Sequence, residues 1–223
     1  MKHNIVLILV LGLCICACGS KNYAGDSKKF PEKITAGVLY FDIYSNSKEL
    51  EPYRAGLTDM FIGKLKELMP ELNVVERSKL DNVMGEFQLS ETGAIDSETA
   101  QKIGRMLGAQ TLYYGSVTSS FGKEMCINGR LVRVETGEVL SAGQNVCSFS
   151  DKDVFDSVDK IAKKLAATIK ADYKTLIADV YYSKGRTAEE SGDKDGAIRF
   201  YQQSLQFSSD HKLSQKALVR LKL

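Results

Sequence analysis

The sequence predicts an α/β protein: a mixed β-sheet packed by helices, followed by a helical tail. Short segments rich in β-branched and aromatic residues alternate with longer segments whose apolar residues recur every three or four positions. The last three strand-like segments follow one another directly, which favours an antiparallel run. Beyond residue 171 only helical patterns remain. The predicted order is therefore β-α-β-α-α-β-β-β-α, followed by the tail.

Length and composition limit the classes of function. The chain has 223 residues, 43% of them hydrophobic, which is enough for a buried core. A formal net charge of +2 provides no field to attract nucleic acid. The two histidines are His3 and His211, and the sequence has no phosphate loop and no metalloprotease or serine hydrolase motif. We therefore expect no enzyme, no catalytic or metal site, no cofactor and no nucleic-acid partner.

The first 17 residues are typical of a signal peptide. A lysine precedes an apolar run over residues 5–15, which is shorter than the ~20 residues that a transmembrane helix needs. Residues 15–18 resemble a bacterial lipobox in which Cys18 becomes the lipidated first residue; the alternative is an ordinary leader or an anchor helix. Gly19 and Ser20 follow in place of aspartate, which favours the outer membrane. Residues 18–33 are polar and predict a tether, so we expect a periplasm-facing lipoprotein.

The first predicted strand and helix follow the tether. Residues 34–44 are almost continuously apolar, which predicts one buried strand. Pro70 then ends a helix. Its apolar residues at helical spacing are Tyr53, Leu57, Phe61, Leu65 and Leu68.

Two more helices precede the third strand. Residues 73–77 predict a short strand, and Ser78 with Asp81 predicts the capped start of a helix. This helix carries Leu80, Val83, Met84 and Phe87. After a turn-rich loop over residues 90–95, Asp96 predicts the N-cap of a helix that Gly108 closes. The buried face of that helix is predicted to contain Ala100, Ile103 and Leu107. Residues 111–118 predict the third strand.

Residues 125–148 predict a β-hairpin that contains two cysteines. If Glu135 and Glu138 close a two-residue loop, Cys126 and Cys147 face each other across the strands, where a disulfide is feasible. A bulge at Gly137 would shift this register by one residue. The alternatives to a disulfide are two buried thiols or a redox pair, although no CxxC spacing is present.

A long helix follows the hairpin and is expected to close over the sheet. Ser150 with Asp153 predicts its capped start. Its apolar stripe consists of Val154, Val158, Ile161, Leu165 and Ile169. We therefore expect an α/β domain over residues 34–170 and a helical tail over residues 171–223. In the tail, helix-forming sequence breaks at Gly192, resumes over residues 195–207 and ends in a short helix.

The tail resembles one tetratricopeptide unit over residues 178–211, and a plain helical hairpin is the alternative. The matching residues are Tyr181, Gly185, Gly192, Ala197, Tyr201 and Leu205. A single repeat cannot bury its own face, so it must pack on the preceding helix, on another subunit or on a partner. Candidate partner-binding residues are Tyr181, Tyr182, Phe200, Tyr201 and Phe207, with core packing as the alternative use.

An ordered set of segments resembles a known family. The segments are VVERSKL at residues 74–80, DSETAQKIG at 96–104, LGAQTLYYGSV at 107–117 and RLVRVETGEVLSAG at 130–143. Together they resemble the curli production assembly/transport (CsgG-type) family of envelope lipoproteins. In the pore-forming member, long hairpins follow the third and fifth strands. Here only residues 119–124 connect the third strand to the fourth, and a helix begins soon after residue 148. Neither place has room for an inserted pair of membrane strands, because each such strand needs ~9–11 residues. The resemblance therefore implies the periplasmic module without its pore.

From this resemblance we expect a lipid-anchored scaffold or assembly factor that acts through protein–protein contacts at the outer membrane. The alternatives are a subunit or accessory ring of a curli-like fibre secretion complex and an activator of a cell-wall synthase. The expected partners are envelope proteins, the membrane through the anchor, and other copies of the chain.

Overall fold

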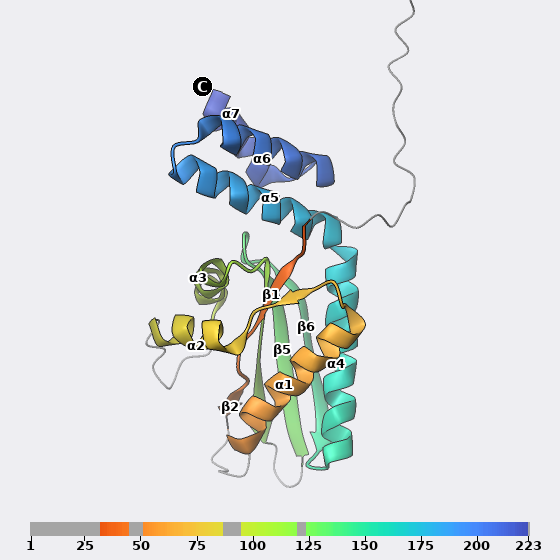
Figure 1. The fold of residues 1–223 in the computed structure, drawn as a ribbon. Helices are drawn as coiled ribbons and strands as arrows, with labels where there is room; N and C mark the ends of the chain where they lie inside the picture. Colours follow the sequence, from red (N-terminus) through yellow and green to blue (C-terminus); the bar gives the residue numbers. More distant parts are fainter. Residues whose placement is uncertain (1–31, 45–50, 87–94, 120–123, 223) are drawn as a thin grey trace, which may run out of the picture. The chain divides into compact units, whose positions relative to one another are not determined.

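One mixed sheet lies at the centre of the chain (Figure 1). The computed structural model describes residues 32–44, 51–86, 95–119 and 124–222. The strands in these ranges are β1 (Thr35–Val38), β2 (Asp42–Tyr44), β3 (Asn73–Val74), β4 (Thr111–Ser119), β5 (Glu124–Arg133) and β6 (Val139–Ser148). The sheet order is β3-β1-β4-β5-β6, and β2 also pairs with β4. The pairs β1–β3, β1–β4 and β2–β4 are parallel, whereas β4, β5 and β6 are antiparallel. The α/β class with an antiparallel run is confirmed.

Helices cover both faces of the sheet (Figure 1). The helices of the described ranges are α1 (Glu51–Leu68), α2 (Arg77–Glu86), α3 (Ser97–Leu107), α4 (Asp151–Ala171), α5 (Tyr173–Glu190), α6 (Lys194–Phe207) and α7 (Lys212–Lys222). Helices α1 and α4 bury their apolar stripes against one face, which we call the α4 face. Helices α2 and α3 pack on the opposite face, the α3 face. Each face thus has its own apolar core.

Two N-caps predicted from the sequence are confirmed. The Asp96 carboxylate accepts a hydrogen bond from Thr99 N, and the Ser150 hydroxyl accepts one from Asp153 N. The predicted Gly108 cap ends α3 at φ 68°, in the left-handed region where glycine avoids the Cβ penalty. Local side-chain chemistry therefore sets the start of α3 and α4 and the end of α3.

The first predicted strand is two strands separated by a bulge. Val38 pairs with Tyr113 and Asp42 with Ser116, so residues 39–41 lie opposite only two residues of β4. The extra residue changes the alternation of side chains. Val38 and Phe41 consequently both face the α4 core, whereas Leu39 faces the α3 core.

The second predicted strand and its helix cap need correction. Strand β3 contains only Asn73–Val74, and α2 already begins at Arg77. Leu80 N donates to Glu76 O at 3.1 Å, so the helical hydrogen bonds start before Ser78. The assignment of Ser78 as N-cap is therefore wrong. Phe87, predicted on the same helix, lies outside the described residues.

The predicted register of the hairpin is wrong by one residue. Arg133 N donates to Glu138 O at 2.9 Å, so the loop contains residues 134–137 and not two residues. A register shift between Leu131 and Val132 then leaves Leu140 as an extra residue on β6. The combination of a longer loop and a bulge moves every residue of β6 relative to the predicted pairing.

The cysteines do not face each other in this register. Cys126 pairs with Val146, and Cys147 pairs with Met125. Since neighbouring residues of a strand point to opposite faces, the two thiols lie on different faces of the sheet. Cys147 belongs to the α4 core, and both thiols are free. The predicted Cys126–Cys147 disulfide is therefore wrong for this structure.

The tail consists of α5, α6 and α7, as predicted. A Cβ at Gly185 would lie 2.4 Å from the Tyr201 ring, so α5 and α6 approach closely because residue 185 has no side chain. The other end of the tail is not separate from the sheet, because Leu176 and Ile177 of α5 belong to the core of the α4 face. Residues 32–223 form one compact unit. The tetratricopeptide-like interpretation stays a prediction.

Among the described helices, none combines the length and apolar composition that a membrane crossing requires.

We expect two glycine-to-alanine changes to alter stability in opposite directions. A Cβ at Gly104 of α3 would lie 2.3 Å from a methyl group of buried Val134, so Gly104→Ala should lower the free energy of unfolding by about 1–3 kcal/mol. Gly56 of α1 has no atom within 4 Å of such a Cβ, so Gly56→Ala should raise it by about 0.5–1 kcal/mol. Urea unfolding measures both, and two changes of the same sign would contradict this packing.

Candidate functional site

The α3 face of the sheet is covered over only part of its area. Helix α3 packs on Leu112 and Val132, which are paired across β4 and β5. The next two rows across β4, β5 and β6 are Tyr114–Arg130–Ala142 and Ser116–Asn128–Gln144. Arg130, Ala142 and Gln144 are exposed. The uncovered part therefore presents polar side chains side by side on a rigid sheet.

These two rows line a groove of about 490 Å³, which we call the outer groove. Strand β2 contributes Asp42 and Tyr44, and Ile95, just before α3, adds an apolar contact. Parallel pairing of β2 with β4 places Asp42 directly beside Ser116. The groove is thus built by four strands, and the bulge at residues 39–41 fixes which β2 side chains reach it.

Several polar groups of the outer groove are available to a ligand. Arg130 is exposed and has no ion pair with any described residue. Tyr114 is only 8% exposed, and its hydroxyl has no hydrogen-bond partner among the described residues. Tyr44 is 45% exposed and donates to Asp42 at 3.4 Å. Burial raises the pKa of Asp42, and nearby Arg54 opposes this shift.

The side chains of the outer groove are suited to binding a polar polypeptide segment more than to catalysis. The amides of Asn128 and Gln144 both donate and accept hydrogen bonds, and a guanidinium binds carboxylates in a bidentate manner. An exposed tyrosine at the margin adds apolar contact area. No group of three or more His, Cys, Asp or Glu residues suited to hold a metal occurs in the described part of the chain.

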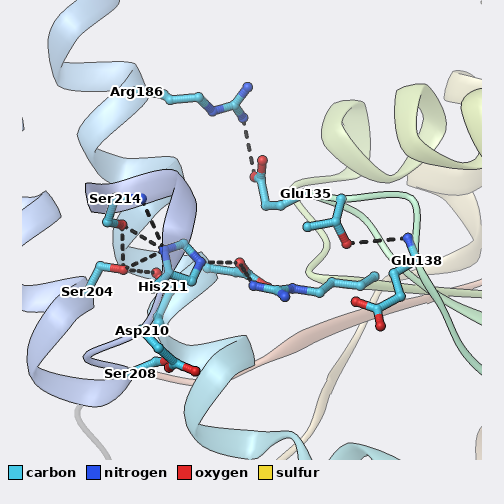
Figure 2. A network of polar contacts seen from close by, with 12 residues as sticks. Glu135, Glu138, Arg186, Ser204, Ser208, Asp210, His211 and Ser214 are labelled. Carbon is cyan, nitrogen blue, oxygen red and sulfur yellow. Dashed lines mark hydrogen bonds and ion pairs between the residues drawn. The ribbon is translucent and has the colours of Figure 1, made fainter. Parts of the chain in front are cut away.

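A second polar site joins the tail to the end of the hairpin, and we call it the tail junction. Asp179 of α5 is fully buried, and its carboxylate accepts two hydrogen bonds of 2.7 Å from Arg133 at the end of β5. His211, just before α7, lies 2.9 Å from the same carboxylate. Figure 2 shows His211 beside Ser204 and Ser214. Arg133 and His211 therefore meet at one buried carboxylate, and His211 links it to Ser204 of α6 and Ser214 of α7.

Ser214, His211 and Asp179 are linked in the order of a serine hydrolase triad, but the two ring nitrogens of the histidine have exchanged partners. His211 Nδ1 lies 2.8 Å from Ser214 Oγ, and Nε2 faces Asp179. However, Ser204 and Ser214 have no exposed surface, and Ser204 Oγ donates to Ala178 O at 2.8 Å. A substrate carbonyl cannot reach either hydroxyl in this arrangement. The cluster instead satisfies buried polar groups where the helices meet.

A second ion pair lies beside the tail junction. Arg186 of α5 lies 3.4 Å from Glu135 in the hairpin loop (Figure 2). Burial raises the pKa of Glu135, and the positive charge of Arg186 opposes this shift. The guanidinium of Arg186 also lies 5.7 Å from the Tyr182 ring centroid. The tail thus contacts the hairpin end through two buried or half-buried charge pairs.

The aromatic residues predicted to bind partners mostly pack inside the chain. Tyr181 and Tyr201 are 7% and 0% exposed, so the prediction of an exposed contact is wrong for both. Tyr181 stacks on Phe207 at 5.2 Å, and Tyr182 lies 5.6 Å from Tyr201. Phe200 is half-buried and packs against two of the cores. Cys18, the predicted lipidation site, lies outside the described residues.

Sequence reasoning missed both sites. Asp179 is the one charged residue between Leu176 and Tyr182, and a lone charge in an apolar helical run is a signal for a buried, paired carboxylate. No comparable local signal marks the outer groove. Arg130 and Gln144 are ordinary solvent-facing positions of strands until the pairing of β4, β5 and β6 brings them together.

Residues 23–125 match the family model described as "Curli production assembly/transport component CsgG". This match confirms the resemblance found in the sequence. No curated protein gives a significant match to the chain.

Three solved structures show distant, partial similarity. The C-terminal domain of LpoB from Salmonella enterica is 20% identical, with 52% of this chain and 82% of that chain covered and a TM-score of 0.43. Lipoprotein GNA1162 from Neisseria meningitidis is 15% identical, with 59% and 96% covered and a TM-score of 0.43. The PelC dodecamer from Paraburkholderia phytofirmans is 14% identical, with 61% and 88% covered and a TM-score of 0.37.

The buried carboxylate of the tail junction yields a stability prediction. Asp179→Asn should lower the free energy of unfolding by about 3–5 kcal/mol, because the Arg133 side chain, 13% exposed, loses its buried counter-charge. Urea unfolding measures the loss. As a control, Glu98→Gln breaks an exposed ion pair with Lys102 on α3 and should cost less than about 1 kcal/mol. Equal losses in the two variants would contradict the role of the junction.

Proposed function

On the premise that residues 23–125 match the CsgG family model, we propose that the protein is a lipid-anchored scaffold or assembly factor of the cell envelope. It acts through protein–protein contacts on the periplasmic side of the outer membrane and catalyses no reaction. The lipobox-like sequence before Cys18 supports the anchor, and the outer groove supports the contact.

The outer groove carries this proposal. It combines Arg130, an exposed cation with no ion pair to a described residue, with the amides of Asn128 and Gln144 on adjacent strands. Groups on paired strands keep fixed spacing, so little conformational entropy is lost when a partner binds. A partner segment with a carboxylate beside backbone amides would match these donors and acceptors.

The tail junction supports the same function in a different way. The tail is held to the hairpin by Asp179 and Arg133, and its α5 helix shares the core of the α4 face. Tail and sheet are therefore fixed relative to each other at this junction, as a scaffold requires. We propose that the tetratricopeptide-like tail presents a second surface to envelope partners.

The anchor has a direct test. Cys18→Ala should abolish incorporation of labelled fatty acid and release the protein from membranes, because the acceptor thiol is lost. Cys16→Ala keeps a small residue before Ala17 and should leave lipidation unchanged. Membrane retention by the Cys18 variant equal to that of the unmodified protein would tell against the anchor.

The contact surface is testable by site-specific crosslinking in intact envelopes. A photo-reactive residue at Gln144 should yield a defined crosslinked partner, whereas one at Gln203, an exposed glutamine of α6, should not yield that product. Arg130→Glu should lower partner affinity by about tenfold, which corresponds to about 1.4 kcal/mol. The same product from both positions, or one unaffected by Arg130→Glu, would exclude the outer groove.

The identity of the crosslinked product separates the proposed role from its two alternatives. Recovery of cell-wall synthases would support an activator. Recovery of fibre subunits with a ring of export proteins would support a secretion accessory. Recovery of an envelope assembly protein of neither kind would support the scaffold.

A further inference from the structure

Three glycines form a row across the centre of the sheet. Gly115 pairs with Gly129, and Gly129 pairs with Gly143, so the row crosses β4, β5 and β6 in register. A Cβ at Gly129 would lie 1.8 Å from the hydroxyl of Tyr113, a residue of the α4 core. A Cβ at Gly143 would have Lys164 of α4 as its nearest neighbour, at 3.6 Å. The Tyr113 hydroxyl therefore fills the space over Gly129, and the Phe41 ring, 2.8 Å from a Cβ at Gly115, fills the space there. Open space remains on the α4 face only beside Gly143.

The hydroxyl of Tyr113 packs against Gly129 and is a buried polar group. The ring is 1% exposed and stacks on Phe61 with centroids 4.2 Å apart. The hydroxyl has no hydrogen-bond partner among the described residues. A buried polar group of this kind costs about 1–3 kcal/mol unless something binds it. Burial also raises the pKa of Tyr113, so the phenol stays protonated and available as a donor.

A cavity of about 200 Å³ connects this hydroxyl with two lysines. Its lining includes Tyr113, Ser141, Gly143, Lys160 and Lys164. Lys164 uses one N–H to reach Ala142 O, which leaves two donors. Lys160 is exposed and has no ion pair with any described residue. The cavity thus combines hydroxyl donors with two positive charges and no lining carboxylate.

We propose that this cavity binds a small oxyanion, a phosphate group that accepts hydrogen bonds from the Tyr113 and Ser141 hydroxyls and pairs with Lys160 and Lys164. A water molecule would satisfy the phenol alone, whereas a phosphate would also pair with both exposed ammonium groups, which are otherwise solvated. The cavity is large enough for inorganic phosphate or for a glycerol phosphate headgroup. The inference does not rest on the proposed function, since none of the four side chains named for the anion lines the outer groove. The two linings share Gly129, Gly143 and Gln144.

The experiment titrates the purified full chain with inorganic phosphate and follows the melting temperature and the amide signals of Ser141 and Gly143. We expect a saturable rise in melting temperature, as for any ligand of the folded state, with shifts at both amides. Tyr113→Phe should weaken phosphate affinity by about tenfold. This variant should fold, because it keeps the stacked ring and removes an unpartnered hydroxyl.

Two further variants separate a built site from general charge. Lys160→Gln should reduce phosphate affinity at least as strongly as Tyr113→Phe. Lys163→Gln removes an equal charge from the same helix outside the cavity lining, where Lys163 pairs with Asp159, and should leave phosphate affinity unchanged. The absence of a saturable response, or equal losses in Lys160→Gln and Lys163→Gln, would overturn the proposal.

A second titration with glycerol phosphate identifies the source of the anion. Binding at least tenfold tighter than inorganic phosphate, lost in Tyr113→Phe, would support the site with a lipid headgroup as ligand. Equal affinity for the two compounds, also lost in Tyr113→Phe, would support it with free phosphate as ligand. Binding of either compound that survives in Tyr113→Phe at full strength would overturn the site.

Discussion

The arrangement of the described elements depends most on the buried ion pair between Asp179 and Arg133. A charge with no exposed surface is tolerated only when it is paired and hydrogen-bonded, and here Arg133 supplies both conditions with two bonds of 2.7 Å. His211 adds a third contact. Because Arg133 ends β5, Asp179 lies in α5 and His211 precedes α7, one carboxylate constrains the hairpin end and two segments of the tail.

Two single-residue irregularities decide what each face of the sheet displays. The extra residue within 39–41 places Phe41 in the α4 core, and the extra residue Leu140 shifts the outer half of β6. Without them the alternation of side chains would carry apolar residues to the wrong face. The extra residue Leu140, together with the loop at residues 134–137, also places Cys126 and Cys147 on different faces and Gln144 beside Asn128 in the outer groove.

The outer groove and the oxyanion cavity arise from adjacent residues of one strand. Arg130 lines the outer groove on the α3 face, while its neighbour Gly129 lets the Tyr113 hydroxyl pack closely on the α4 face. A central strand can serve two sites because its side chains alternate and because helices cover each face only in part. The two sites share Gly129, Gly143 and Gln144, but they use different charged side chains, Arg130 in the outer groove and Lys160 and Lys164 in the cavity.

The sequence by itself determined the order and type of the elements, and in several places their limits. Apolar periodicity predicted α1, α4 and the tail helices, and Asp96, Ser150 and Gly108 predicted caps, because these signals act within one or two turns of helix. Three of the four segments that resemble the CsgG family lie within the match over residues 23–125, and the segment at 130–143 lies beyond it. Tertiary structure alone decided the hairpin register, the bulge after Val38 and the residues that pair with Asp179. These depend on which distant groups must be paired once they are buried, and no local pattern encodes that pairing.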